Sequence, residues 1–102
     1  MIHVTAAFVA QAGKETQLHS VLTALLEPTR NEQGCLRYVL LKDKNDATKF
    51  LFQELFADQA AFDFHCDQPY FHALLAKLDG LLAQEPEMKV QKSRKASART
   101  AQ

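Results

Sequence analysis

The chain has 102 residues, of which 47% are hydrophobic and 24% are charged, as in one small globular domain with a single core. This composition excludes disorder for most of the chain, and no stretch has the apolar length that a membrane span requires. Twelve basic residues balance twelve acidic ones, but four of the basic residues lie in the last eleven positions. The first 91 residues therefore carry eight basic against twelve acidic groups, and this negative balance disfavours a nucleic-acid partner.

The first two predicted elements are a strand and an amphipathic helix. Residues 2–11 alternate between two faces, with Ile2 and Phe8 on the same face, which is the pattern of a strand with at least one buried side. Apolar residues then recur at the i, i+3, i+4 and i+7 spacing of a helix: Leu18, Val21, Leu22 and Leu25. We expect this helix to end near Pro28.

A β-hairpin is predicted in the middle of the chain. The turn-forming residues 31–34 precede a strand at 35–41 that is rich in Leu, Val and Tyr. Polar residues at 42–48 form the next turn, and a strand at 49–56 follows. Because the connection is short, we expect the two strands to pair antiparallel.

The second helical region is expected to be broken at Pro69. Asp58 can cap a short helix with its carboxylate, and Pro69 can start the next helix because the first position needs no N–H donor. The apolar stripe of that helix consists of Phe71, Leu74, Leu75, Leu78, Leu81 and Leu82. Residues 86–92 then alternate as a short edge strand, where Pro86 is tolerated.

The resulting β-α-β-β-α-β order predicts an α+β fold, the ferredoxin-like split β-α-β plait, with a four-stranded antiparallel sheet and helices on one face. Both faces of the central strands are apolar, since Leu51 and Leu55 lie opposite Phe50 and Phe52. Helices can cover only one face, so we expect a second copy of the sheet to cover the other in a two-fold homodimer. A monomer with some exposed apolar side chains is the alternative.

The two ends of the chain and its cysteines predict location and domain limits. The first residues lack the basic flank and apolar block of a signal peptide, so we expect a cytoplasmic protein. Cys35 and Cys66 form neither a disulfide framework nor a CxxC pair, and free thiols are expected. Residues 93–102 contain no large apolar side chain, which predicts a basic flexible tail after a folded domain of residues 1–92.

Glu54 is a carboxylate within an otherwise apolar strand. Alternation places it on the phenylalanine side of that strand, the face expected to meet the helices. A carboxylate there needs a partner, because its ionised form loses hydration on burial. His65, near the end of the short helix, is the candidate partner, and an ion pair with Arg37 or Lys49 is the alternative.

Aromatic side chains could line an acid–base pocket around Glu54 and His65. Tyr38 on the neighbouring strand and Tyr70 after the helix break supply phenol groups. Five phenylalanines are candidate walls of the pocket, although such residues more often pack in the core: Phe50, Phe52, Phe62, Phe64 and Phe71. The His and Cys residues lack metal-ligand spacing and the glycines are isolated, so neither a metal site nor a cofactor site is predicted.

Two segments of the chain resemble the antibiotic biosynthesis monooxygenase family. The first is PTRNEQGCLRYVL at residues 28–40, and the second is FQELFADQAAFDFHCDQPYF at residues 52–71. The second contains a strand glutamate followed by the pattern A-x-x-x-H-x-x-x-P, here Glu54, Ala61, His65 and Pro69. The resemblance covers about residues 2–92 and implies a dimeric ferredoxin-like protein with a pocket between sheet and helices.

The resemblance implies a monooxygenase that oxidises a small aromatic phenol or quinol with molecular oxygen and without a cofactor. It implies Glu54 and His65 as catalytic residues, and the expected substrate-binding residues are Tyr38, Phe52, Phe62, Tyr70 and Phe71. Tyr70 stands where many relatives have a second histidine, which argues against a two-histidine mechanism. Two alternatives stay open: an isomerase of a small phosphorylated signalling sugar, with Arg30 and Arg37 as candidate cations, and a non-catalytic small-molecule-binding stress protein.

Overall fold

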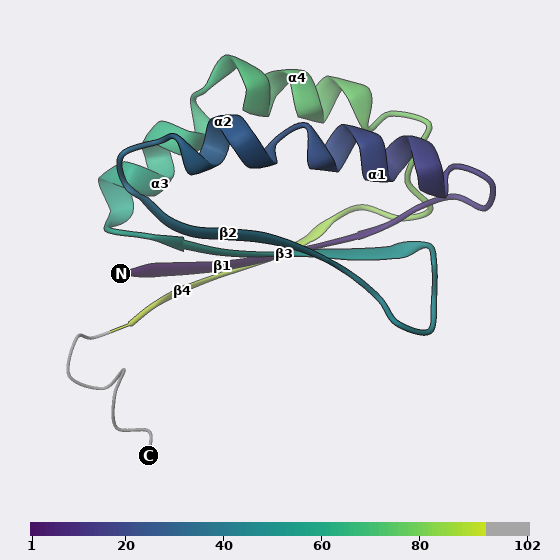
Figure 1. The fold of residues 1–102 in the computed structure, drawn as a ribbon, viewed down its shortest axis with the longest axis horizontal. Helices are drawn as coiled ribbons and strands as arrows, with labels where there is room; N and C mark the ends of the chain where they lie inside the picture. The colour runs from purple at the N-terminus through teal and green to yellow at the C-terminus, as the bar shows by residue number, and fades with distance from the viewer. Residues whose placement is uncertain (94–102) are drawn as a thin grey trace.

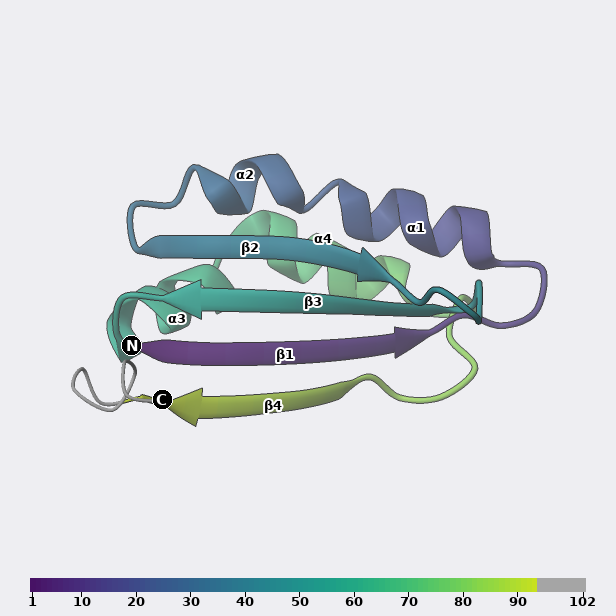
Figure 2. The same cartoon turned by 60° about the horizontal axis from the view of Figure 1, so that its bottom comes forward.

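The helices lie on one side of a four-stranded sheet in the computed structural model, which describes residues 1–93 (Figure 1). The elements in chain order are β1 (Ile2–Val9), α1 (Glu15–Thr23), α2 (Leu26–Arg30), β2 (Cys35–Lys42), β3 (Lys49–Phe56), α3 (Gln59–Cys66), α4 (Pro69–Lys77) and β4 (Glu87–Lys92). The strand order is β2-β3-β1-β4 and all neighbours pair antiparallel (Figure 2). The predicted α+β ferredoxin-like plait is therefore confirmed.

Two predictions concern the C-terminal tail and membrane spans. The basic tail expected from residue 93 lies, apart from Ser93, outside the described residues. Within residues 1–93, no helix combines the length and the apolar character that crossing a membrane requires.

The first helical region differs from the prediction at its end. Helix α1 ends at Thr23, five residues before Pro28, and a separate short helix, α2, contains Pro28. Pro28 is the third residue of α2, within the first turn, where a missing N–H donor leaves no hydrogen bond of the helix unmade. Proline therefore marks the start of a helix here, and the prediction that it marks an end was wrong.

The second helical region is broken as predicted. The Asp58 carboxylate accepts a hydrogen bond of 2.9 Å from the Ala61 N–H at the start of α3, and Pro69 is the first residue of α4. Leu74, Leu78 and Leu81 of the predicted stripe are buried, whereas Leu75 is 51% exposed. Leu82 is partly buried against the core and Phe71 contacts the buried His65, so Leu75 is the member of the predicted stripe that was wrongly assigned to the core.

The core lies between the sheet and the helices. Alternate residues of β1 and β3 are buried, among them Val4, Phe8, Phe50 and Phe52. The phenylalanine side of β3 is thus the helix side, as predicted, and Glu54 shares it with 7% of its surface exposed.

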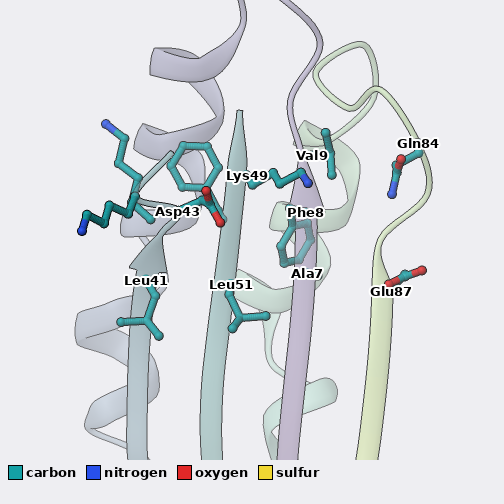
Figure 3. A pocket seen from close by; sticks show the side chains of 12 residues that line it. Ala7, Phe8, Val9, Leu41, Asp43, Lys49, Leu51, Gln84 and Glu87 are labelled. Carbon is teal, nitrogen blue, oxygen red and sulfur yellow. The ribbon is translucent and has the colours of Figure 1, made fainter. Parts of the chain in front are cut away.

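Among the described residues, no helix lies on the other side of the sheet, here called the open face. Leu41, Leu51, Ala7 and Glu87 form one row across its four strands, and Leu41 is 41% exposed. This row lines a hollow of about 580 Å³ beside the end of the β2–β3 hairpin (Figure 3). None of the predicted catalytic or substrate-binding residues lines this hollow.

Candidate functional site

Glu54 lies at the centre of the candidate site, in the middle of β3. It is paired across the sheet with Val4 on β1 and Tyr38 on β2, and both neighbours are buried. Among residues 1–93, no side chain forms an ion pair or a hydrogen bond with its carboxylate. The alternative partners Arg37 and Lys49 alternate onto the open face, so the ion pair proposed with either of them is not formed.

The surroundings of Glu54 favour its protonated form. Burial, and secondarily the negative charge of Glu32, raise the pKa of Glu54 from 4.5 to about 8. A carboxyl group with a pKa near neutrality can either give or take a proton at physiological pH.

His65 is held near the end of α3 within a cage of aromatic rings. Its own surface is 1% exposed, and its ring centroid lies 5.1 Å from that of Phe56, 5.2 Å from Phe71 and 5.6 Å from Tyr38. The carboxylate that it contacts belongs to Glu32, whose Oε2 lies 2.9 Å from the histidine Nδ1. The expected direct partnership of His65 with Glu54 is therefore replaced by one with Glu32.

Glu32 is the site residue that the sequence did not reveal. It lies in the turn between α2 and β2, where polar residues are normally solvated, yet it is only 7% exposed. Tyr70 at the start of α4 donates its phenol O–H to the same Glu32 Oε2. The one available signal was the position of Glu32 inside the 28–40 segment that carries the family resemblance.

The tyrosines connect the two halves of the site. Tyr38 stacks on Phe52 with ring centroids 4.8 Å apart, and it lies between Glu54, its neighbour across the sheet, and His65. Burial and the Glu54 charge raise the pKa of Tyr38, which keeps its phenol neutral. Burial and the hydrogen bond to Glu32 likewise raise the pKa of Tyr70.

The structure gathers most of the predicted pocket aromatics around His65 and Glu54. Tyr38, Phe52, Tyr70 and Phe71 are the predicted substrate-binding residues with contacts in this cluster. Phe62 lies further out, with its ring 5.5 Å from that of Phe56. Phe64, expected as a wall, is 54% exposed, because it lies on the outer side of α3, and that expectation was wrong.

Gly34 allows the Glu32 turn to approach α3. The Gly34 carbonyl accepts a 2.9 Å hydrogen bond from the Ala57 N–H, and a Cβ atom at position 34 would collide with the Cβ of Ala61. We expect Gly34→Ala to lower the free energy of unfolding by about 1–3 kcal/mol, because the turn and α3 must separate. Urea denaturation would measure this loss.

The neighbouring exposed residue provides the control for that substitution. Gln33→Ala in the same turn should change stability by less than about 0.5 kcal/mol. Equal stability of Gly34→Ala and wild type would show that the turn does not need this close approach.

The described residues also bear on metal binding. Within residues 1–93, no three His, Cys, Asp or Glu side chains are grouped as they would be to hold a metal ion. The acid–base groups that the site does bring together are Glu54, Glu32, His65 and two neutral phenols.

Comparison with known proteins defines the family. The model of the antibiotic biosynthesis monooxygenase family matches residues 1–77, and the chain belongs to this family. The uncharacterised protein sll1783 of Synechocystis sp. is 35% identical over 79 residues, which are 78% of this chain and 54% of that protein. The chain thus spans about half the length of this relative. Rv0793 of Mycobacterium tuberculosis, named as a candidate monooxygenase, is 30% identical over 81 residues, or 79% of each chain.

Solved structures agree with this assignment. The crystal structure of PA3566 from Pseudomonas aeruginosa has a TM-score of 0.85 and 29% identity, over 91% of this chain and 93% of that one. The structure of Rv0793 has a TM-score of 0.86 and 25% identity, over 91% and 94% of the two chains. The family resemblance stated from the sequence is confirmed.

Proposed function

We propose that this protein is a monooxygenase that oxidises a small phenol or quinol with molecular oxygen, using Glu54 as the base. The observation that carries the proposal is the Glu54 carboxyl group, which is buried, has no hydrogen-bond or ion-pair partner among residues 1–93, and has a pKa raised to about 8. A general base works best when its pKa lies near the operating pH, and a phenol of ordinary pKa is too weak an acid for an unperturbed carboxylate.

The proposed reaction starts with proton transfer. Glu54 removes a proton from a substrate hydroxyl, and the resulting electron-rich anion passes electrons to oxygen. For a quinol, one oxygen atom enters the ring to give a hydroxyquinone and the other leaves as water. The quinol supplies two electrons and the hydroxylated carbon supplies two more, so the four-electron reduction of oxygen is complete without a further reductant.

The aromatic residues would orient the substrate and exclude water. Tyr38, Phe52 and Phe71 place aromatic rings around the Glu54 and His65 region, which suits a flat aromatic molecule. Phe62 and Tyr70 complete the proposed substrate-binding set, with Tyr70 acting through its bond to Glu32.

The arrangement of charges favours this reaction over isomerisation of a phosphorylated sugar. Such a substrate requires cations, and Arg37 alternates onto the open face. Arg30 donates its Nε–H to the Tyr38 carbonyl at 2.9 Å. The Glu32 carboxylate lies in the site itself, and it would repel a phosphate.

Oxygen uptake by the full chain with a panel of quinols and phenols tests the proposal, with chelator-treated protein included because no cofactor is part of the proposed reaction. We expect uptake with at least one quinol, and a product that carries one atom from labelled oxygen gas. Turnover of a phosphorylated sugar, or a ligand-dependent rise in melting temperature without any product, would overturn the proposal. A cytoplasmic location stays a prediction alongside it.

We further propose that a second copy of the chain covers the open face. The face carries apolar side chains on three strands, with Val39 and Leu41 on β2, Leu51 on β3 and Val9 on β1, and sheet-on-sheet packing would bury them together with the hollow of Figure 3. The homodimer predicted from the sequence thus remains a proposal.

Leu41→Glu is expected to weaken such a dimer by about 10-fold or more, because two carboxylates would enter an apolar interface at symmetric positions. Light scattering after size exclusion at several concentrations measures this effect. Leu75→Glu provides a matched control, since Leu75 is also a half-exposed leucine but lies on α4, away from the open face. A monomeric wild-type protein at micromolar concentration would contradict the proposed assembly.

A further inference from the structure

Glu32 and His65 form a buried pair that joins two distant parts of the chain. Glu32 lies before β2 and His65 lies near the end of α3, and their side chains are 3% and 2% exposed. The 2.9 Å separation of Nδ1 and Oε2 requires a proton between them. That proton belongs either to the histidine or to a protonated Glu32.

Tyr70 helps to decide between these two states. Its O–H donates to the same Oε2 atom, and the atom also lies at hydrogen-bond distance from Nδ1. An oxygen that accepts from two donors is best served by a carboxylate, whose atoms are acceptors only. The proton between Glu32 and His65 then resides on Nδ1.

The opposite ring nitrogen has a different environment. None of the hydrogen bonds among residues 1–93 involves Nε2 of His65. With Nδ1 protonated and bound, Nε2 of the neutral ring carries the lone pair.

We propose that Glu32 is a positioning residue that holds His65 as the Nδ1–H tautomer, so that Nε2 is the nitrogen available to exchange a proton with the substrate, and that Tyr70 fixes Glu32 in this role. The assignment of the His65 tautomer follows from the contacts of Glu32 alone. The role of this tautomer in catalysis rests on the function proposed above.

The other oxygen of Glu32 supports a role beyond packing. Oε1 is buried and has no hydrogen-bond partner among the described residues. An unsatisfied buried acceptor lowers stability, and an apolar side chain at this position would avoid that loss. Glu32 therefore orients His65 at a cost to the stability of the fold.

Nitrogen NMR of the full chain labelled at histidine tests the tautomer directly. Long-range correlations distinguish a protonated ring nitrogen from a bare one, and the His65 signals are assigned by their loss in His65→Asn. At a pH where the ring is neutral, we expect a protonated Nδ1 and a bare Nε2 in the wild-type protein. A protonated Nε2 in the wild type overturns the proposal without the need for any variant.

Variants then separate positioning from structure. Glu32→Ala should shift the His65 tautomer towards Nε2–H and lower kcat by about 10²-fold with little change in KM. Tyr70→Phe should keep the Nδ1–H tautomer, because the hydrogen bond between Nδ1 and Glu32 remains, but it should lower kcat by a smaller factor than Glu32→Ala, because Glu32 loses the contact that fixes it; an unchanged kcat would overturn the role of Tyr70. Glu27→Gln, which removes an exposed carboxylate from the neighbouring helix α2, should leave both the tautomer and kcat unchanged.

The NMR and activity measurements also test the role of Glu32 and the proposed monooxygenase function separately. A tautomer that is unchanged in folded Glu32→Ala would overturn the role of Glu32, whatever the activity. The expected tautomer in a protein that consumes no oxygen with any substrate would overturn the proposed function and leave the tautomer assignment intact.

Discussion

At pH 7, Glu54→Gln is expected to be more stable than the wild-type protein by about 3 kcal/mol. The folded protein holds the Glu54 proton up to about pH 8, whereas the unfolded chain releases it near the ordinary pKa of 4.5. Between these values the unfolded state binds fewer protons, so wild-type stability falls by about 1.4 kcal/mol per pH unit. Glutamine resembles the protonated side chain in shape and does not ionise, so it avoids this loss.

The stability difference between Glu54→Gln and the wild-type protein should grow as the pH rises. Below about pH 4.5 the glutamate is protonated in both states and the two proteins should be about equally stable, while above about pH 8 the difference should be constant and largest. Urea denaturation at several pH values between 4 and 9 measures it. Exposed Glu27→Gln should show no such trend. A glutamine variant that is less stable than wild type at pH 7 would indicate an unrecognised partner for the carboxylate.

The same substitution is expected to lower kcat/KM by roughly 10²–10⁴-fold, the usual contribution of a positioned general base. In the wild-type protein the ionised fraction of Glu54 grows about tenfold per pH unit below its pKa of about 8, so kcat/KM should rise with pH and level off near that value. Oxygen uptake with the best quinol, followed from pH 6 to pH 9, measures the profile. The rising limb should be absent in Glu54→Gln.

Two companion variants define how specific this loss is. His65→Ala should also lose most activity, since it removes the second acid–base group of the site. Cys66→Ala, next to His65 in the chain, should retain activity and folding. Wild-type activity in both the Glu54 and the His65 variants would mean that the reaction takes place elsewhere in the protein.

Together these two predictions describe a conflict between stability and function. The carboxyl group proposed as the base is also a group whose burial destabilises the fold at neutral pH. A sequence selected for stability alone would place an apolar or amide side chain at position 54.

Patterns local in sequence predicted most of the fold. Alternation in β3 placed Glu54 on the helix side, and the chemistry of Asp58 and Pro69 located both helix starts, because strand alternation, capping and proline geometry depend on near neighbours. Pro28 misled because a proline before a turn suits both the end of one helix and the first turn of the next.

The missing part of the site depends on contacts between distant segments. Glu32 and His65 are 33 residues apart, and nothing near Glu32 distinguishes a buried turn glutamate from a solvated one. Its burial follows from the approach of the turn to α3 at Gly34, which only the folded arrangement reveals. Glu54 could be predicted because it is a charged residue within an apolar strand, whereas Glu32 lies in a polar turn where a carboxylate is ordinary.

The hydrogen bond from Ala57 to Gly34 has a consequence for the order of assembly. It closes the base of the β2–β3 hairpin and brings together the turn that carries Glu32 and the start of the segment that carries His65. The hairpin can form from local contacts, but the Glu32–His65 pair needs α3 docked against it. Local opening of α3 would therefore separate the pair while the sheet stays intact, so amide hydrogen exchange in α3 should report on the integrity of the site more sensitively than exchange in the strands.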